Sequence, residues 1–321
     1  MTVCGAPVAV QCLDHLTGAT SNRVRQNIKY ALGDNTNNEG HPRQAAFYMN
    51  LRMVKTSAAD RIEPDGLPLS GAARHPTVAE GAQMERDGYL VVRHFFGANQ
   101  VADLLRWTME LESAPEVPGR HWVYREDSLT QPGQRVIQRI ENFAPFHAGF
   151  ERLIRNGALA RWVGALMGGP VVLFKDKVNF KMPGGGGFKA HQDQQAGWGR
   201  YAPIFVSAMV TLDPATLENG CLEIAARRNR EGLIGEEWNP LDENGLSLQP
   251  VPTAPGDVIF FDSFVPHASK PNLTDAARRI LYLTYNLASR GDHRVRYFAD
   301  KHASFPPDIE REAGKTYVFR V

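Results

Sequence analysis

His191-Gln192-Asp193 follows a run at residues 171–182 whose composition and alternation are typical of a β-strand. If the extended backbone continues to residue 193, His191 and Asp193 point to one face of the strand and Gln192 points to the other. One imidazole nitrogen and one carboxylate oxygen then converge on one point. The stretch therefore predicts two ligands of a metal site at the end of a strand.

A third ligand is expected downstream, at His267. This histidine follows the apolar run 258–261, which comes directly after the turn sequence Pro255-Gly256-Asp257, so it would end a strand of the same β-barrel. Two histidines and one carboxylate on one side of an iron(II) ion leave coordination positions open for oxygen and an organic co-substrate. A bare H-x-D pattern is weak evidence by itself, since buried histidines are more often packing residues than ligands.

Residues 277–286 predict a further strand, which carries the adjacent cations Arg278 and Arg279. Neighbouring residues of a strand face opposite ways, so only one of the two can point into a barrel. Arg278 shares its face with Tyr282, and Arg279 shares its face with Leu283. Hydrophobicity alone therefore leaves the choice open.

Several segments, in this order, resemble the phytanoyl-CoA dioxygenase family of iron(II)/2-oxoglutarate-dependent oxygenases. They are Phe188-Lys189-Ala190-His191-Gln192-Asp193, Glu218-Asn219-Gly220-Cys221-Leu222, Pro255-Gly256-Asp257, His267 and Arg278. The resemblance covers roughly residues 77–285. It implies a mainly β chain with flanking helices (α+β), folded as a double-stranded β-helix, the jelly-roll or cupin-like barrel.

The resemblance also implies the chemistry of the site. His191, Asp193 and His267 would be the catalytic iron(II) ligands, and Arg278 rather than Arg279 would bind the distal carboxylate of the co-substrate 2-oxoglutarate. The enzyme would use O2 to oxidise an unactivated C–H bond of a small molecule while 2-oxoglutarate is decarboxylated to succinate and CO2. Because Asp193 is present where related halogenases have a small residue, hydroxylation is favoured, although desaturation, epoxidation and cyclisation use the same centre.

Alternation in residues 174–181 places polar side chains on one face, and either face could point inward. These polar residues are Lys175, Lys177, Asn179 and Lys181. One interpretation is a solvated lysine face. The corresponding strand of the family contacts the co-substrate, however, which implies that Asn179 and Lys177 are 2-oxoglutarate contacts.

Three residues are candidates for contact with the substrate. Arg139 belongs to a polar segment that is either solvated or lines a mouth over the metal. Gln195 and Trp198 come soon after the ligands and could reach the cavity, with a wall role as the alternative for Trp198. Polar residues near Arg139 and Lys177 indicate a small anionic or zwitterionic substrate such as an aminophosphonate, whereas the aromatic content suits a natural-product intermediate of secondary metabolism.

Two alternatives to this function remain from the sequence. One is a cupin-type oxygenase or isomerase that needs no 2-oxoglutarate, against which the cation at Arg278 argues. The other is a non-catalytic jelly-roll binding protein in which His191 and His267 only pack.

The composition provides enough apolar residues for a substantial core and almost no net charge. The 321 residues include 43% hydrophobic side chains, and 36 basic against 35 acidic residues leave a formal net charge of +1. The net charge is therefore too small for the whole chain to attract nucleic acid or a membrane surface electrostatically. Assembly into a homo-oligomer stays open. The three cysteines are odd in number and widely spread, which fits a reducing compartment and predicts a cytoplasmic location.

Residues 1–76 show no sustained hydrophobic period, so we expect an N-terminal extension that is weakly structured or forms a lid or arm. Thr77, followed three residues later by Glu80, predicts a capped helix start. The oxygenase domain should then span residues 77–321. The opening residues have neither a basic leader nor a long apolar core, so we do not expect a secretory signal. No apolar run approaches the ~20 residues of a membrane span.

Overall fold

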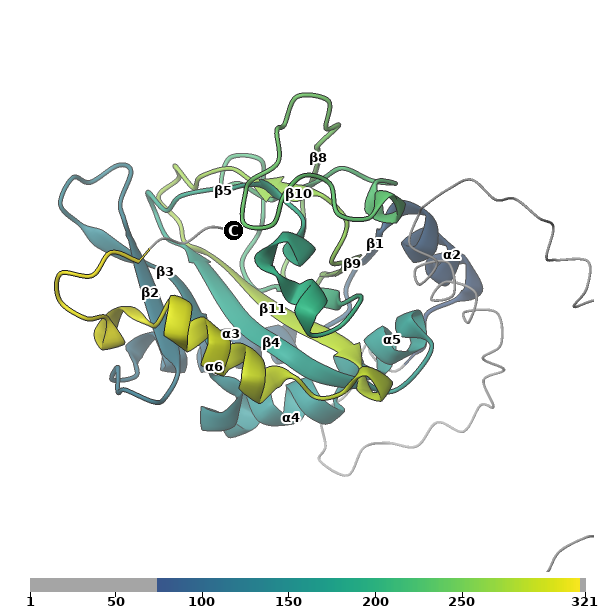
Figure 1. Cartoon of the computed structure of the whole chain (residues 1–321), viewed down its shortest axis with the longest axis horizontal. Helices are drawn as coiled ribbons and strands as arrows, with labels where there is room; N and C mark the ends of the chain where they lie inside the picture. The colour runs from purple at the N-terminus through teal and green to yellow at the C-terminus, as the bar shows by residue number, and fades with distance from the viewer. Residues whose placement is uncertain (1–73, 318–321) are drawn as a thin grey trace, which may run out of the picture. The chain divides into compact units, whose positions relative to one another are not determined.

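The computed structural model describes residues 74–317. Its strands form two antiparallel sheets with helices beside them, so the expected mainly β fold of the jelly-roll type is confirmed (Figure 1). The expected boundary at residue 76 concerns an extension that lies almost wholly outside the described residues, and that extension stays a prediction. Among residues 74–317, no helix is long and apolar enough to cross a membrane.

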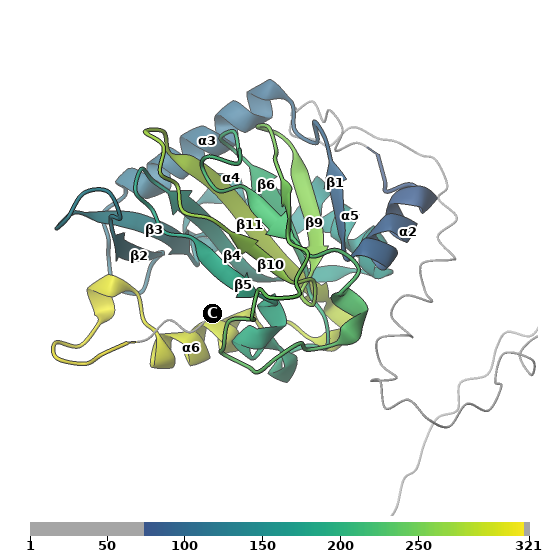
Figure 2. The same ribbon diagram turned by 90° about the horizontal axis from the view of Figure 1, so that it is seen from above.

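The larger sheet has seven strands, which lie side by side in Figure 2. In spatial order they are β1 (Tyr89–Val92), β9 (Val258–Asp262), β6 (Val206–Thr211), β11 (Arg278–Leu287), β4 (Val171–Lys181), β3 (Arg135–Glu141) and β2 (Trp122–Asp127). The smaller sheet has four, in the order β5 (Phe188–His191), β10 (His267–Ser269), β7 (Leu222–Ile224) and β8 (Gln249–Val251). From β4 onward the chain crosses repeatedly between the sheets, which brings distant segments to one interior.

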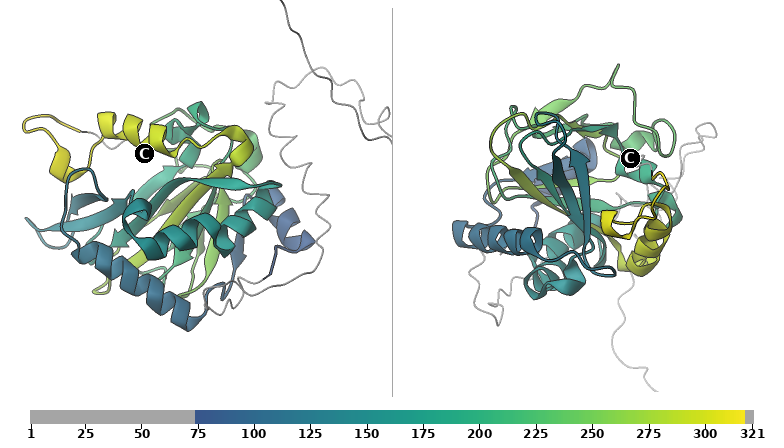
Figure 3. Two further views of the ribbon diagram at one scale, coloured as in Figure 1. Left: turned by 90° about the horizontal axis from the view of Figure 1, so that it is seen from below. Right: turned by 90° about the vertical axis from the view of Figure 1, so that its left-hand side faces the viewer.

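Helices cover one face of the larger sheet (Figure 3). They are α3 (Ala98–Ser113), α4 (Ala148–Asn156) and α5 (Ala158–Met167). Helix α5 packs on β4, β6 and β11, where Trp162 stacks on Phe260 with ring centroids 5.5 Å apart. Val178 and Phe180 of β4 belong to this core. The alternate residues of β4, the lysine and asparagine face, therefore point to the barrel interior, which decides the question that alternation left open.

Two more helices frame the barrel. Helix α2 (Val78–Asp87) begins at Thr77 with the expected capping box, and both hydrogen bonds between Thr77 and Glu80 are present. Helix α6 (Arg294–Ser304) lies on the opposite side of the larger sheet from α3 and α4 (Figure 2). Tyr297 and Phe298 of α6 are buried among aromatic side chains that include Trp198.

Short 3-10 segments complete the described chain. They are η2 (Ala144–Phe146), η3 (Asp193–Ala196), η4 (Trp198–Arg200), η5 (Asn229–Glu231), η6 (Ala288–Arg290) and η7 (Asp308–Glu310). Segment η3 begins directly after β5, and this turn shapes the candidate metal centre.

Candidate metal centre

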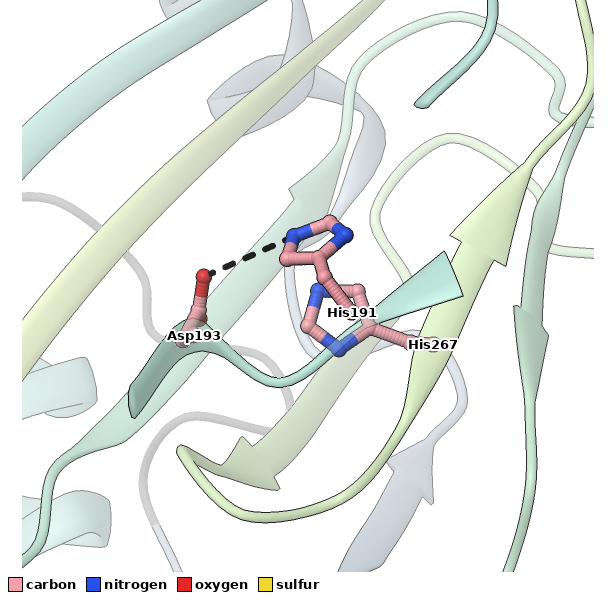
Figure 4. A group of neighbouring side chains, drawn as sticks. All are labelled: His191, Asp193 and His267. Atoms are coloured by element: carbon pink, nitrogen blue, oxygen red, sulfur yellow. Dashed lines mark ion pairs between the residues drawn. The ribbon is translucent and has the colours of Figure 1, made fainter. Parts of the chain in front are cut away.

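The two histidines lie opposite each other on neighbouring strands of the smaller sheet. His191 of β5 pairs directly with His267 of β10, and their ring centroids are 4.4 Å apart. Asp193 Oδ1 lies 4.0 Å from His191 Nε2 (Figure 4). One ligand atom from each of the three residues lies within 4.8 Å of the other two. The structure therefore brings His191, Asp193 and His267 together as a group that could hold one metal ion.

Asp193 reaches this group by a turn, which differs from the expected straight extension of the strand. Strand β5 ends at His191, and Asp193 is the first residue of η3. The Gln192 side chain is fully buried and donates to the carbonyl oxygens of Phe264 (2.6 Å) and Gly232 (2.8 Å). The Gln195 side chain closes the turn by accepting the Gln192 N–H at 2.9 Å. These amide contacts bend the chain so that the carboxylate faces the histidines.

Gln192→Ala is expected to lower the free energy of unfolding by about 1–3 kcal/mol and to weaken iron(II) binding, because the partners of a fully buried amide lose their hydrogen bonds. Denaturant unfolding and an iron(II) titration measure the two effects. Gln194→Ala is the matched control, since Gln194 lies in the same turn and its amide makes one long bond of 3.5 Å to Ala202 O. Equal stability and iron affinity in the two variants would show that Gln192 does not hold the turn.

The protonation states of the three side chains suit metal binding. Nδ1 of His191 lies 2.7 Å from Lys189 O, and Nδ1 of His267 lies 3.0 Å from Val265 O. A carbonyl accepts only, so each Nδ1 carries the proton and each Nε2 presents a lone pair. Burial, with the neighbouring His267, lowers the pKa of His191 to about 3, and burial also lowers the pKa of His267.

The carboxylate is ionised as well. Burial raises the pKa of Asp193, but the nearby His267 and Lys177 outweigh that effect and leave the pKa below its usual value. Two neutral imidazoles and one carboxylate are the donor forms that a divalent transition metal needs. The residues present therefore fit an iron(II) ion.

Unpaired buried polar atoms lie farther along the interior. Arg278 is 1% exposed, and its Nε and Nη1 have no hydrogen-bond partner among the described residues. Oδ1 of Asn179 is likewise buried without a partner in this part of the chain. Arg279 instead faces the other way and binds Asp213 through Nε (2.7 Å) and Nη2 (3.1 Å). The two free N–H groups of Arg278 fit a carboxylate of a co-substrate in the barrel.

A small hollow opens beside Asp193 and His267. Its lining residues are Lys175, Lys177, Asp193, Trp198, Ser207, Phe261, His267, Tyr282 and Thr284. The ammonium group of Lys177 lies 4.6 Å from the centroid of the Tyr282 ring, and no ion pair joins it to any described residue. Burial, and then the charge of Lys175, lower the pKa of Lys177 to about 8.

Two expected substrate contacts are not among the residues that line the hollow. Arg139 is buried, and its Nε lies 2.8 Å from Glu141 Oε1. The Gln195 amide donates to the carbonyl oxygens of Glu236 and Asn239, each at 2.7 Å, so it fastens a loop and does not line the hollow. Each side chain is held by a partner in the fold that the linear sequence does not reveal. Trp198, by contrast, does line the hollow.

Other residues of the site were not singled out from the sequence. Lys175 and Tyr282 line the hollow. Alternation placed Lys175 on the polar face of β4 and Tyr282 on the face of Arg278 in β11, but neither was given a role. Lys301 comes from α6 and binds Glu141 through its ammonium group. No motif links these two residues, which are 160 positions apart.

The sequence profile of the phytanoyl-CoA dioxygenase (PhyH) family matches residues 84–280, which include all three candidate ligands and Arg278. The chain belongs to this family. The resemblance drawn from the quoted segments is thereby confirmed.

Two curated relatives of this PhyH-family chain act on phosphonates according to their names. The 2-aminoethylphosphonate dioxygenase of Uncultured bacterium HF130_AEPn_1 is 36% identical over 245 residues, covering 75% of this chain and 93% of the relative. The methylphosphonate hydroxylase of Gimesia maris is 37% identical over 241 residues, covering 71% of this chain and 89% of the relative.

Solved structures of EctD from S. alaskensis share the fold. The structure with 2-oxoglutarate and 5-hydroxyectoine is 24% identical to this chain, with a TM-score of 0.57 over 67% of this chain and 77% of that one. The structure with bound Fe is 25% identical, with a TM-score of 0.55 over 67% and 78%.

The family, its relatives and the ligand group make this chain a non-haem iron(II)/2-oxoglutarate-dependent dioxygenase with a small-molecule substrate. The expected cofactor iron(II), co-substrate 2-oxoglutarate and O2 belong to this class. Nothing in the site favours the two alternatives, a 2-oxoglutarate-independent cupin-type enzyme and a binding protein without a metal.

Proposed function

We propose that this dioxygenase hydroxylates a carbon of a small organophosphonate, with His191, Asp193 and His267 binding iron(II). The support from relatives is that two enzymes with phosphonate names align over most of their length. The observation that carries the proposal is the positive charge of Lys175 and Lys177 at the wall of the hollow.

The charge on this wall is not neutralised locally. Lys175 Nζ lies 3.7 Å from Glu141 Oε1, but the same carboxylate also binds Arg139 and Lys301. One carboxylate cannot neutralise three cations, and Lys177 has no ion pair with a described residue. Asp193, the one carboxylate among the described lining residues, is a proposed metal ligand. Because unpaired buried charge is costly, the site favours an anionic group such as a phosphonate.

Each part of the site has a role in this proposal. Bound iron(II), with 2-oxoglutarate and O2, supplies the oxidising power for an unactivated C–H bond. Nε2 of each histidine and the Asp193 carboxylate hold the metal, while the free guanidinium of Arg278 binds the distal carboxylate of 2-oxoglutarate. Asn179 would contact the same co-substrate by donating through its Nδ2. Lys175 and Lys177 hold the phosphonate, and the rings of Trp198 and Phe261 exclude water beside the target carbon. This assignment moves Lys177 from the co-substrate, where the resemblance placed it, to the substrate.

A substrate panel tests the proposed reaction. Methylphosphonate and 2-aminoethylphosphonate are incubated with enzyme, iron(II), 2-oxoglutarate and O2, and products are followed by phosphorus NMR while succinate is quantified. We expect a hydroxylated phosphonate in equal amount to succinate. If ectoine or proline is oxidised in preference to every phosphonate, the proposed substrate class is wrong.

Lys175→Met is expected to raise KM for the phosphonate about 10- to 100-fold with a smaller change in kcat, because a hydrogen bond to a charged group contributes about 1.5–3 kcal/mol. Steady-state kinetics at saturating 2-oxoglutarate measure both constants. Lys315→Met, a change at an exposed lysine that pairs with Glu312, is the control. An unchanged KM in Lys175→Met would remove Lys175 from the substrate site.

Two further predictions from the sequence are carried forward with this proposal. We infer a cytoplasmic enzyme that binds neither nucleic acid nor membrane, on the near balance of 36 basic and 35 acidic residues and the sparse cysteines. Assembly into a homo-oligomer is left to a measurement of molar mass in solution.

A further inference from the structure

We propose that Lys181 is a positioning residue of the 2-oxoglutarate site, which orients the hydroxyl group of Ser269 and adds a second positive charge beside Arg278. This inference rests on the proposed assignment of Arg278 to the distal carboxylate of 2-oxoglutarate. It concerns the co-substrate and is independent of the phosphonate assignment.

Lys181 and Arg278 form a buried pair of cations. Lys181 ends β4 and lies directly opposite Arg278, the first residue of β11. Their exposed fractions are 2% and 1%. Nζ of Lys181 donates to Ser269 Oγ (2.8 Å), to Gly220 O (3.3 Å) and to Lys270 O. All three acceptors are neutral, and no ion pair joins either cation to a carboxylate within residues 74–317.

The charge of Lys181 is not needed for these bonds alone. A neutral amide could donate to two of the same oxygens without the cost of burying a cation. Burial, and then the adjacent guanidinium of Arg278, lower the pKa of Lys181 to about 7. Two unpaired buried cations side by side indicate that an anion occupies this end of the barrel in the working enzyme.

The contact with Lys181 sets the direction of the Ser269 hydroxyl proton. In its charged form Lys181 only donates, so Ser269 Oγ accepts in this contact and keeps its own O–H to donate. Ser269 comes two residues after His267 on β10, so both side chains point to the same face of the strand. No described residue accepts the Ser269 proton. The free O–H, together with Nε and Nη1 of Arg278, supplies donors for a carboxylate.

Lys181→Met in the full-length chain tests the inference. Each protein is loaded with iron(II) without oxygen and titrated with 2-oxoglutarate, and binding is followed by the visible charge-transfer band of the chelate. The same titration uses 2-oxovalerate, whose chain carries a methyl group in place of the distal carboxylate. We expect the Kd for 2-oxoglutarate to rise at least about tenfold, with the Kd for 2-oxovalerate and iron(II) binding unchanged. A wild-type Kd for 2-oxoglutarate, or equal losses for both ligands, would overturn the inference.

A double-mutant cycle with Ser269→Ala tests the orienting role. If Lys181 acts partly through the hydroxyl group, the combined loss of 2-oxoglutarate affinity is smaller than the product of the two single losses. Losses that simply multiply would overturn this part. Should Lys181→Met fail to fold, Lys181→Gln takes its place, because its amide can donate to two of the same oxygens without the charge. An unchanged Kd for 2-oxoglutarate in Lys181→Gln would overturn the role of the charge.

Arg278→Ala separates this inference from the assignment on which it rests. If Arg278→Ala keeps wild-type affinity for 2-oxoglutarate, the assignment of Arg278 fails. If Arg278→Ala weakens binding and both Lys181 variants do not, only the inference about Lys181 fails.

Discussion

His267→Ala, His191→Ala and Asp193→Ala are each expected to abolish turnover and iron(II) binding while the barrel stays folded. Each change removes one of three proposed protein ligands, and two ligands hold a divalent metal far more weakly than three. The fold should survive because the three side chains lie outside the hydrophobic core clusters, and Asp193 and His267 line the hollow. Metal analysis after dialysis, succinate release and circular dichroism measure the three outcomes.

His302→Ala is the control for this set, since His302 lies at the surface on α6 and pairs with Glu310. It should keep wild-type iron content and activity. Near-normal iron binding in any one of the three ligand variants would mean that the residue replaced is not a ligand. A different residue would then have to supply the third ligand, in place of one of the three whose ligand atoms lie within 4.8 Å of one another.

Arg278→Ala is expected to weaken 2-oxoglutarate binding at least about a hundredfold and to leave iron(II) binding intact. Removal of one partner of a buried ion pair typically costs about 3–5 kcal/mol, because the other charge stays buried without compensation. In this protein the partner left behind would be the distal carboxylate of 2-oxoglutarate. The anaerobic titration of the chelate band measures the change directly.

The adjacent arginine provides a matched control. Arg279→Ala removes the same kind of side chain from the same strand, but Arg279 binds Asp213 on the outer side of the sheet. It should lower stability slightly and leave the Kd for 2-oxoglutarate unchanged. A large effect from Arg279→Ala, with none from Arg278→Ala, would move the co-substrate to another part of the barrel.

Local chemistry in the sequence was enough to predict several parts of this molecule. Thr77 and Glu80 predicted the start of α2, because a capping box involves only neighbouring residues. The ordered segments around His191, His267 and Arg278 indicated both the fold and the family, which the match over residues 84–280 confirmed. The choice of Arg278 over Arg279 came from that resemblance, since alternation alone treats the two faces of a strand alike.

Tertiary structure decided which side chains meet inside the barrel. Alternation separated the two faces of β4, but only the burial of Val178 and Phe180 in the core that α5 also joins turned the lysine face inward. Asp193 reaches the histidines by a turn that the buried amide of Gln192 holds through Gly232 and Phe264. Local sequence preferences could not predict these contacts, because the partners lie in loops from other parts of the chain.

The longest-range contacts were the least predictable. Lys181 meets Ser269 across 88 positions, and Lys301 meets Glu141 across 160. In the sequence each of these lysines is an ordinary polar residue of a strand or helix. What the sequence by itself determined were features set within a few residues, namely helix caps, strand alternation and the ligand motif. The buried charges around the hollow depend on which strands pair and which helix closes the barrel, and these are properties of the whole folded chain.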